Sequence, residues 1–139
     1  MIAVVRQGRF WAMPLWRKEA ACCAEAMLTV LNVSDAECEL LLCDDKAISV
    51  LNQRHLGLPG PTNVLSFPAE QGQGLGVIAL SMEAVQREAM LYGQYPLEHF
   101  CRLLAHGLLH LLGFDHGPDM DGATEAMIEA GMANLASEA

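Results

Sequence analysis

Apolar residues recur along the chain with two different periods, and the period of each segment predicts its secondary structure. Short, mostly apolar runs typical of strands lie at Met1–Arg6, Glu37–Cys43, Thr62–Phe67 and Leu75–Leu80. Apolar residues at helical spacing lie at Leu15–Leu31, at Asp44–Leu56, from Ser81 to about Gln94, at Pro96–Gly113 and at Asp119–Leu135. This order predicts a single small α+β domain over residues 1–139, in which about four strands form one mixed sheet packed with about five helices.

Capping and proline signals add detail to two of these elements. Ser81 is expected to be the N-cap of the helix that follows it, because its hydroxyl can accept a hydrogen bond from a free backbone N–H of the first turn. Pro61 and Pro68 bracket Thr62–Phe67, and proline cannot donate to the hydrogen-bond ladder of a sheet. That segment is therefore predicted to be an edge strand.

Composition and charge exclude several classes of protein. Of the 139 residues, 53% are hydrophobic and 18% are charged, which is typical of a globular domain and not of a disordered or fibrous chain. The net charge of −9 predicts little sequence-independent affinity for nucleic acid, because phosphate binding depends on basic groups. Half of the basic residues lie in the first eighteen positions: Arg6, Arg9, Arg17 and Lys18. They can form a local basic patch for nucleic acid only if the N-terminal strand and helix flank the binding cleft. The acidic last helix is expected to be a solvated face.

Membrane and redox signals point to a cytoplasmic protein. No apolar run approaches the roughly 18 residues of a membrane span, and the apolar start is too short for a signal peptide. The five cysteines are odd in number and include no C-x-x-C pair, so they are expected to be reduced and mostly buried. No membrane partner is expected.

Three histidines follow one another at a spacing that suits a metal site. His106 and His110 are four residues apart, so they share one face of the predicted helix, whose apolar surroundings predict that both are buried and need a partner. Gly113 can end the helix in a left-handed conformation and return His116 toward the same point. Three imidazoles leave the fourth position of a zinc ion open for water, as in catalytic sites. The spacing therefore predicts one Zn²⁺ per chain in a zincin-like site.

Two neighbours of this cluster have alternative roles. Asp115 adjoins His116 and could orient an imidazole, or it could be an ordinary turn carboxylate. His99 lies seven residues before His106, two turns earlier on roughly the same face. A fourth histidine would close the open metal position, so His99 is expected to be a structural residue or to lie at the rim.

One position argues against peptide hydrolysis. The histidine spacing matches the pattern H-E-x-x-H-x-x-G-x-x-H of metzincin metallopeptidases, in which the glutamate is the general base. Gly107 occupies the place of that glutamate, so the chain lacks the side chain that would activate water in a peptidase. The proton acceptor is left open between a metal-bound hydroxide, a path through a hydroxyl of the substrate and an unidentified residue.

The histidine segment resembles the signature H-G-x-L-H-L-x-G-[YF]-D-H of the YbeY endoribonuclease (rRNA maturation factor) family. A second block is also similar: Pro61–Pro68 resembles the family strand P-T-[DN]-V-L-S-F-P, and Leu51-Asn52 with Arg54 resembles the segment L-N-x-x-[YF]-R. The likeness runs from about Asp44 to Leu135. The family usually carries G-D-[IL] where this chain has Val77 after a glycine, so an acidic group expected on that strand is absent.

The resemblance implies a function and a site. It implies a metal-dependent, single-strand-specific endoribonuclease that acts on ribosomal RNA in ribosome maturation and quality control, with a small ribosomal subunit or ribosomal protein as partner and no action on DNA. Arg54, aligned with a family arginine thought to contact RNA phosphate, is the expected catalytic residue. Thr62 and Ser66 share one face of the predicted strand, so they are either substrate-binding candidates or ordinary strand positions. The alternatives are a ribosome-assembly binding factor with a structural metal and, less favoured, a metallopeptidase.

Overall fold

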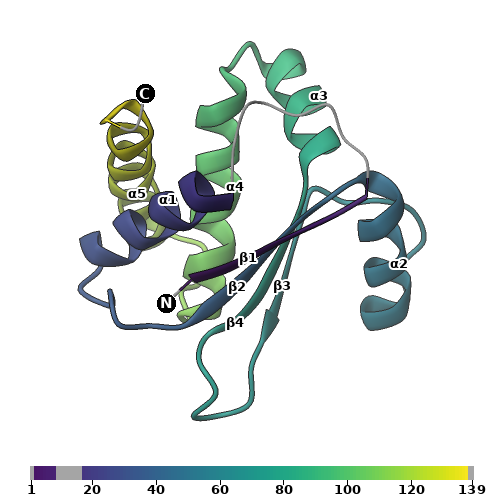
Figure 1. Cartoon of the computed structure of the whole chain (residues 1–139), viewed down its shortest axis with the longest axis horizontal. Helices are drawn as coiled ribbons and strands as arrows, with labels where there is room; N and C mark the ends of the chain where they lie inside the picture. The colour runs from purple at the N-terminus through teal and green to yellow at the C-terminus, as the bar shows by residue number, and fades with distance from the viewer. Residues whose placement is uncertain (1, 9–16, 138–139) are drawn as a thin grey trace.

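Each apolar segment forms the kind of element that its period predicts. The computed structural model describes residues 2–8 and 17–137, and Figure 1 shows the arrangement of its elements. The strands are β1 Ile2–Gln7, β2 Cys38–Cys43, β3 Val64–Pro68 and β4 Gly76–Ser81. The helices are α1 Arg17–Val30, α2 Asp45–Leu56, α3 Met82–Tyr92, α4 Pro96–Leu111 and α5 Pro118–Ser137. The prediction of an α+β fold with four strands and five helices is confirmed for this part of the chain.

The strands form one mixed sheet in the order β1-β2-β4-β3. β1 pairs parallel to β2, and β2 pairs parallel to β4, whereas β3 pairs antiparallel to β4. The prediction that β3 is an edge strand is confirmed. Its start differs from the prediction, because the strand begins at Val64 and leaves Thr62 outside the ladder; the Asn63 side chain there accepts a hydrogen bond from the N–H of Val64 at 2.7 Å.

The helices cover the two faces of the sheet unequally. Figure 1 shows α1, α4 and α5 together on one side of the sheet and α2 on the other. The larger apolar core lies on the first side, where Ile78 and Leu80 of β4 pack with buried side chains of α4 such as Leu104. A smaller core lies under α2, where Ile48 packs with Leu65 of β3. β3 therefore lies at an edge with a helix on each side of it.

The helix ends follow the local sequence signals. Ser81 is the N-cap of α3, as predicted, and its hydroxyl accepts a hydrogen bond from the N–H of Ala84 at 3.2 Å. Asp44 is the N-cap of α2, and Gly57 ends this helix in the left-handed conformation with a φ of 67°. These caps fix where α2 stops, which matters because its last turn reaches the candidate site.

Gly76, the first residue of β4, has a backbone conformation that only glycine adopts easily, with a φ of +134°. A Cβ atom there would overlap the carbonyl oxygen of Phe67 on β3. We expect Gly76→Ala to lower the free energy of unfolding by roughly 3 kcal/mol, because it adds both backbone strain and overlap. Urea denaturation of the variant and the wild type measures this loss. Gly72→Ala is the control, since Gly72 has a φ of +86° but nothing within 4 Å; an equal loss in both variants would contradict the role given to the overlap.

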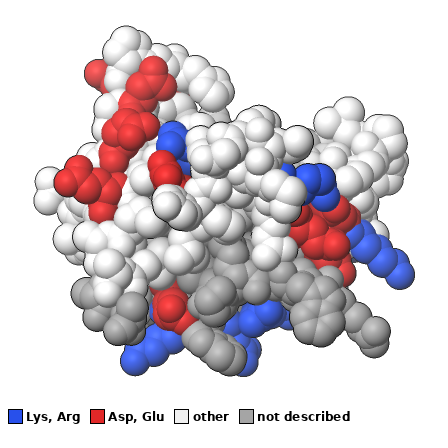
Figure 2. Space-filling model, turned by 90° about the horizontal axis from the view of Figure 1, so that it is seen from above, with Lys and Arg blue, Asp and Glu red and all other residues white. Residues whose placement is uncertain are grey.

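Acidic side chains gather on the side of the molecule that carries α5 (Figure 2). Four of the acidic residues on this helix are exposed: Asp119, Asp121, Glu125 and Glu129. Arg102 of α4 lies 3.3 Å from Glu125 and 3.5 Å from Glu98, so part of this negative charge is paired at the surface. The expectation of a solvated acidic face on the last helix is confirmed.

Two expectations about the class of protein can be compared with the structure. All five cysteines are free, and all but the half-buried Cys22 are buried. The Sγ atoms of Cys23 and Cys101 lie 3.6 Å apart in the core between α1 and α4. Within the described ranges, no helix combines the length and the apolar character that crossing a membrane requires.

Candidate functional site

The three histidines of the sequence motif lie at the end of α4 and in the turn beyond it. His106 and His110 belong to the last turns of α4, which ends at Leu111. Gly113 follows with a φ of +89°, the left-handed conformation that the sequence predicts for the helix end. The N–H of Phe114 donates to the carbonyl of Leu109 at 3.0 Å, which turns the chain back toward the helix. This turn carries His116.

The turn brings the imidazole rings close together. The ring centres of His110 and His116 are 5.2 Å apart, and the ring planes are nearly perpendicular at 76°. Burial lowers the pKa of His106 below its ordinary value, and electrostatic interaction with three neighbours lowers it further: His110, Arg102 and His116. His106 is therefore neutral at neutral pH, which is the state in which an imidazole binds a metal.

The burial of these histidines differs from the prediction. His106 is half-buried, whereas His110 and His116 are exposed. The reason is that α4 is buried through most of its length, but at its end His110 projects away from the core. His99 is the deeply buried histidine, at 4% exposure, and its Nε2 lies 2.8 Å from Oε1 of Glu88. The expectation that His99 is structural is confirmed.

The three histidines are suitable metal ligands by their chemistry, but the structure does not arrange them as a metal site. Among residues 2–8 and 17–137, no group of three or more His, Cys, Asp or Glu side chains is arranged so that it could hold a metal ion. The zincin-like geometry predicted from the spacing is therefore not seen. The donor set, three neighbouring imidazoles of which His106 is neutral, nevertheless suits zinc.

A pocket of about 390 Å³ lies beside the histidines, at the open edge of the sheet. Its walls come from the edge strand β3, from α4 and from the last turn of α2; they include Asn63, Ser66, Leu56, His106 and His110. The pocket is large enough for a small ligand or one unit of a polymer.

Ser66 is a structural residue as well as a wall of this pocket. Its hydroxyl donates to the carbonyl oxygen of Gly107 at 3.3 Å, which ties β3 to α4. The pocket wall is therefore attached to the helix that carries His106 and His110.

Three other residues that the sequence analysis singled out lie outside the pocket lining. Thr62 is half-buried before β3, and Asp115 is exposed in the turn after α4. Arg54 is exposed on the last turn of α2, and it forms no ion pair with any residue in the described part of the chain. Counting from Leu51 along L-N-x-x-[YF]-R places Leu56 at the arginine position, and it is Leu56 that lines the pocket.

Gly107 brings α4 unusually close to the sheet. A Cβ atom at this position would lie 3.0 Å from Cγ2 of Ile78 and 3.2 Å from its Cδ1. A larger side chain here would therefore need Ile78 to shift by a few tenths of an ångström, so the position is tight for the glutamate of a metallopeptidase. This tight packing and the lack of a proton-accepting side chain at Gly107 both count against the metallopeptidase alternative.

Val77 lies on the face of the sheet opposite α4. Successive strand residues point to opposite faces, and the next residue, Ile78, packs against Gly107 of α4. Val77 instead lines a separate cavity of about 310 Å³, together with Glu39, its neighbour in the β2–β4 register. The acidic group that the family pattern places at this position would therefore not enter the histidine pocket.

The basic residues near the N-terminus do not flank the pocket. β1, which carries Arg6, is the edge strand at the opposite side of the sheet from β3. Arg17 and Lys18 are exposed at the beginning of α1, and Arg9 lies outside the described residues. A basic patch formed by the N-terminal strand beside the pocket, which the sequence left open, is not present among the described residues.

One polar cluster was not predicted from the sequence. The carboxylate of Glu88 on α3 accepts hydrogen bonds from Nδ2 of Asn63, at 3.1 Å and 3.3 Å, and lies beside His99 of α4. These residues are 11 to 36 positions apart in the sequence, since 99 − 88 = 11 and 99 − 63 = 36. No local spacing links them, so only the placement of histidine on a buried helix face could have hinted at a partner.

Comparisons with known proteins agree with this fold and motif. A family model described as "Endoribonuclease YbeY" matches residues 10–137. The chain is 40% identical to the Endoribonuclease YbeY of Oleidesulfovibrio alaskensis, over 99% of this chain and 96% of the relative. It is 39% identical to that of Nitratidesulfovibrio vulgaris, over 88% and 89% of the two chains.

A solved structure has the same fold. The solution structure of a Thermotoga maritima protein matches 99% of this chain and 93% of its own length with a TM-score of 0.73, at 23% sequence identity. The sequence matches go further than the fold, because they extend over nearly the whole chain and include the histidine motif. The chain belongs to the YbeY endoribonuclease family.

Proposed function

We propose that the protein is a metal-dependent endoribonuclease that cleaves single-stranded RNA in the cytoplasm, during the maturation and quality control of ribosomal RNA. The observation that carries the proposal is the family match, because relatives named as endoribonucleases align with almost the full length of the chain. The pocket beside three histidines at the sheet edge supports it, since such a pocket can receive one nucleotide of a flexible strand.

His106, His110 and His116 would hold one Zn²⁺ ion. Two imidazoles that bind one zinc ion at about 2.0–2.1 Å have ring centres roughly 5 Å apart. The separation of 5.2 Å between the rings of His110 and His116 supports this assignment. A bound zinc ion would polarise a phosphoryl oxygen or lower the pKa of a water molecule.

The chain's own residues would bind and orient the RNA. Arg54 has an exposed guanidinium on the last turn of α2, the turn whose Leu56 lines the pocket, and a guanidinium can form two parallel hydrogen bonds to a phosphate. β3 forms one wall of the pocket, and Ser66 holds that wall against α4. Thr62, before β3, and Asp115, beside His116, are further candidates for contacts to the substrate and for orienting an imidazole.

A ribosomal partner would compensate for the negative net charge of this enzyme, which weakens its attraction for RNA. The chain carries a net charge of −9, so it attracts RNA poorly at long range. A small ribosomal subunit or a ribosomal protein that binds the enzyme would raise the local concentration of RNA at the pocket. DNA and membranes are not expected to be partners.

A second candidate function has the same ribosomal partner but no catalytic activity. Apart from histidines, the pocket lining identified in the described residues contains no basic side chain. This observation favours a ribosome-assembly binding factor whose metal is structural. Cleavage of RNA by the purified protein distinguishes the two functions.

Purified protein is expected to contain about one zinc ion per chain and to cut single-stranded RNA while leaving casein intact. Elemental analysis measures the metal, and gel assays with labelled RNA and casein measure the two activities. A chelator should stop RNA cleavage, and added Zn²⁺ should restore it. Metal-loaded protein that cuts no RNA would refute the enzyme in favour of the binding factor, and cleavage of casein would revive the peptidase.

A further inference from the structure

Asn63, Glu88 and His99 form a hydrogen-bonded cluster that joins α3, α4 and the start of β3. Glu88 comes from α3 and its side chain is 22% exposed, whereas His99 comes from α4 and Asn63 from the residue before β3. Only Asn63 of the three lines the pocket. Glu88 and His99 can therefore influence the pocket only through the residues that form its wall.

Asn63 has both ends of its side-chain amide engaged. Its Nδ2 donates to both carboxylate oxygens of Glu88, and its Oδ1 accepts from the N–H of Val64. Its backbone carbonyl also accepts from the N–H of Ser81 at 2.9 Å. The amide is held in one orientation and is not free to bind a substrate, so its role is to fix the start of β3.

An edge strand needs such an anchor more than a central strand does. β3 is hydrogen-bonded to a neighbouring strand on one side only, and the pocket lies along the strand. Two side-chain contacts hold it toward α4: Ser66 in the middle of the strand bonds to the carbonyl of Gly107, and Asn63 at its start bonds to Glu88. Glu88 in turn contacts His99, two turns before His106 on the same helix.

We propose that Glu88 is a positioning residue that sets the spacing between β3 and the histidine-bearing helix α4, and so the width of the pocket. This inference rests on the proposed function for its effect on RNA cleavage. A carboxylate suits the role because its two oxygens can accept hydrogen bonds from Asn63 and His99 together. Small displacements of a catalytic wall lower the rate of the chemical step, because the reacting atoms lose their alignment.

The decisive variants exchange hydrogen-bond donors and acceptors at positions 88 and 63 while keeping the shapes of both side chains. In Glu88→Gln one carboxylate oxygen becomes an NH2 donor, so this donor meets Nδ2 of Asn63 where Oε2 accepted before, and the anchor is weakened. Adding Asn63→Asp restores the complementarity, because the amide at position 88 then donates to the carboxylate at position 63. That carboxylate can still accept from the N–H of Val64, and the carbonyl at position 88 can still accept from His99.

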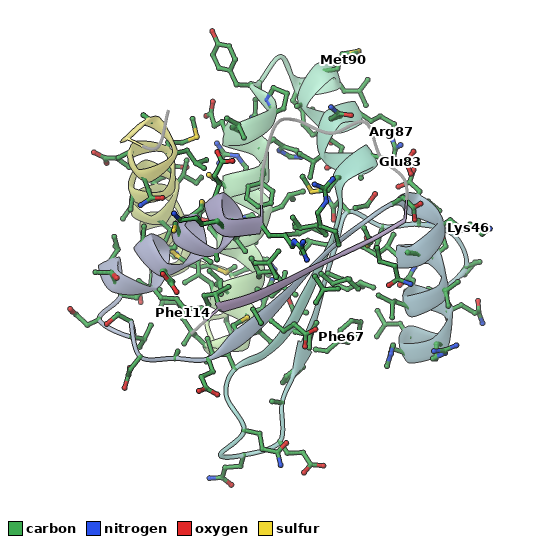
Figure 3. All side chains as sticks on the ribbon, in the orientation of Figure 1. Lys46, Phe67, Glu83, Arg87, Met90 and Phe114 are labelled. Atoms are coloured by element: carbon green, nitrogen blue, oxygen red, sulfur yellow. The ribbon has the colours of Figure 1, made fainter. Side chains whose placement is uncertain are left out.

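Glu83→Gln is the matched control. Glu83 is also a half-buried glutamate of α3 that accepts a hydrogen bond, but its donor is the N–H of Asp45 at the start of α2, at 2.8 Å. Glu83 and Arg87 extend from α3 toward that end of α2 (Figure 3), and neither residue lines the pocket. The control makes the same exchange of a carboxylate for an amide on the same helix, at a residue that does not contact Asn63.

Two measurements test the proposal, steady-state cleavage of single-stranded RNA and amide hydrogen exchange of β3. Glu88→Gln is expected to lower kcat about tenfold with little change in KM, and to speed exchange of the β3 amides about tenfold. The double variant should regain most of both, and Glu83→Gln should resemble the wild type. The proposal is overturned if Glu88→Gln leaves kcat and exchange unchanged, if Glu83→Gln matches it, or if the double variant recovers neither. If wild-type protein cuts no RNA, the proposed function fails, and β3 exchange alone decides whether Glu88 positions the strand.

Discussion

Replacing His110 by alanine is expected to abolish RNA cleavage and to release the metal ion. His110 is exposed, so the truncation removes little packing and the metal-free protein should keep its fold. A missing imidazole leaves two ligands where zinc needs three, so we expect cleavage to fall about a thousandfold or more. The bound ion should also stop stabilising the protein, a loss of about 2.7 kcal/mol at a metal concentration 100 times the Kd.

The His110→Ala experiment combines elemental analysis, RNA cleavage and thermal unfolding with and without added Zn²⁺. His55→Ala is the control for metal content, because His55 is an exposed histidine on α2 that packs against Phe67 and does not belong to the three-histidine motif. Wild-type and control protein should gain thermal stability from Zn²⁺, and His110→Ala should not. A His110→Ala protein that keeps one ion and full activity would show that the histidine assignment is wrong.

Replacing Arg54 by alanine is expected to lower RNA cleavage about tenfold to a hundredfold while leaving the fold unchanged. The guanidinium is exposed and forms no ion pair within the described ranges, so no structural contact is lost with it. The loss should come from weaker binding of phosphate. Binding measured at several salt concentrations should therefore show a slope smaller by about one counterion.

Lys46→Ala is the matched control for Arg54→Ala. Lys46 is an exposed basic residue at the other end of the same helix, where the pocket does not reach (Figure 3). It should weaken binding far less than Arg54→Ala does. Equal effects of the two variants would indicate only general attraction. No effect of Arg54→Ala would exclude this residue as the phosphate contact and direct attention to Leu56→Arg, which places a guanidinium in the pocket lining.

The elements of the fold could be predicted because their signals are local. The period of apolar residues and caps such as Ser81 depend on neighbours within a few positions, so they can be read without the tertiary structure. The start of β3 could not be predicted in this way. Thr62 continues the alternation of the strand, but the chain leaves the ladder at Asn63, whose side chain bonds to Glu88 of another helix.

The candidate site was predictable to a similar extent. The four-residue spacing and the glycine turn predict that His106, His110 and His116 come together, and the ring centres of the last two lie 5.2 Å apart. Burial was misjudged because an apolar helix sequence does not show where the helix extends past the core, as α4 does at His110. The contacts of Glu88 depend on the packing of α3 against α4, and no short-range pattern contains that information.

The sheet separates two surfaces that can change independently. Val77 of β4 and Glu39 of β2 lie on one face of the sheet. On the other face, Ile78 packs against Gly107 of the histidine-bearing helix α4. Evolution can therefore exchange charge at Val77 at little expense to the chemistry of the opposite face. For protein engineering, the exposed Glu39 is a suitable place to attach a fluorescent reporter, because β2 does not neighbour β3 and Glu39 does not line the histidine pocket.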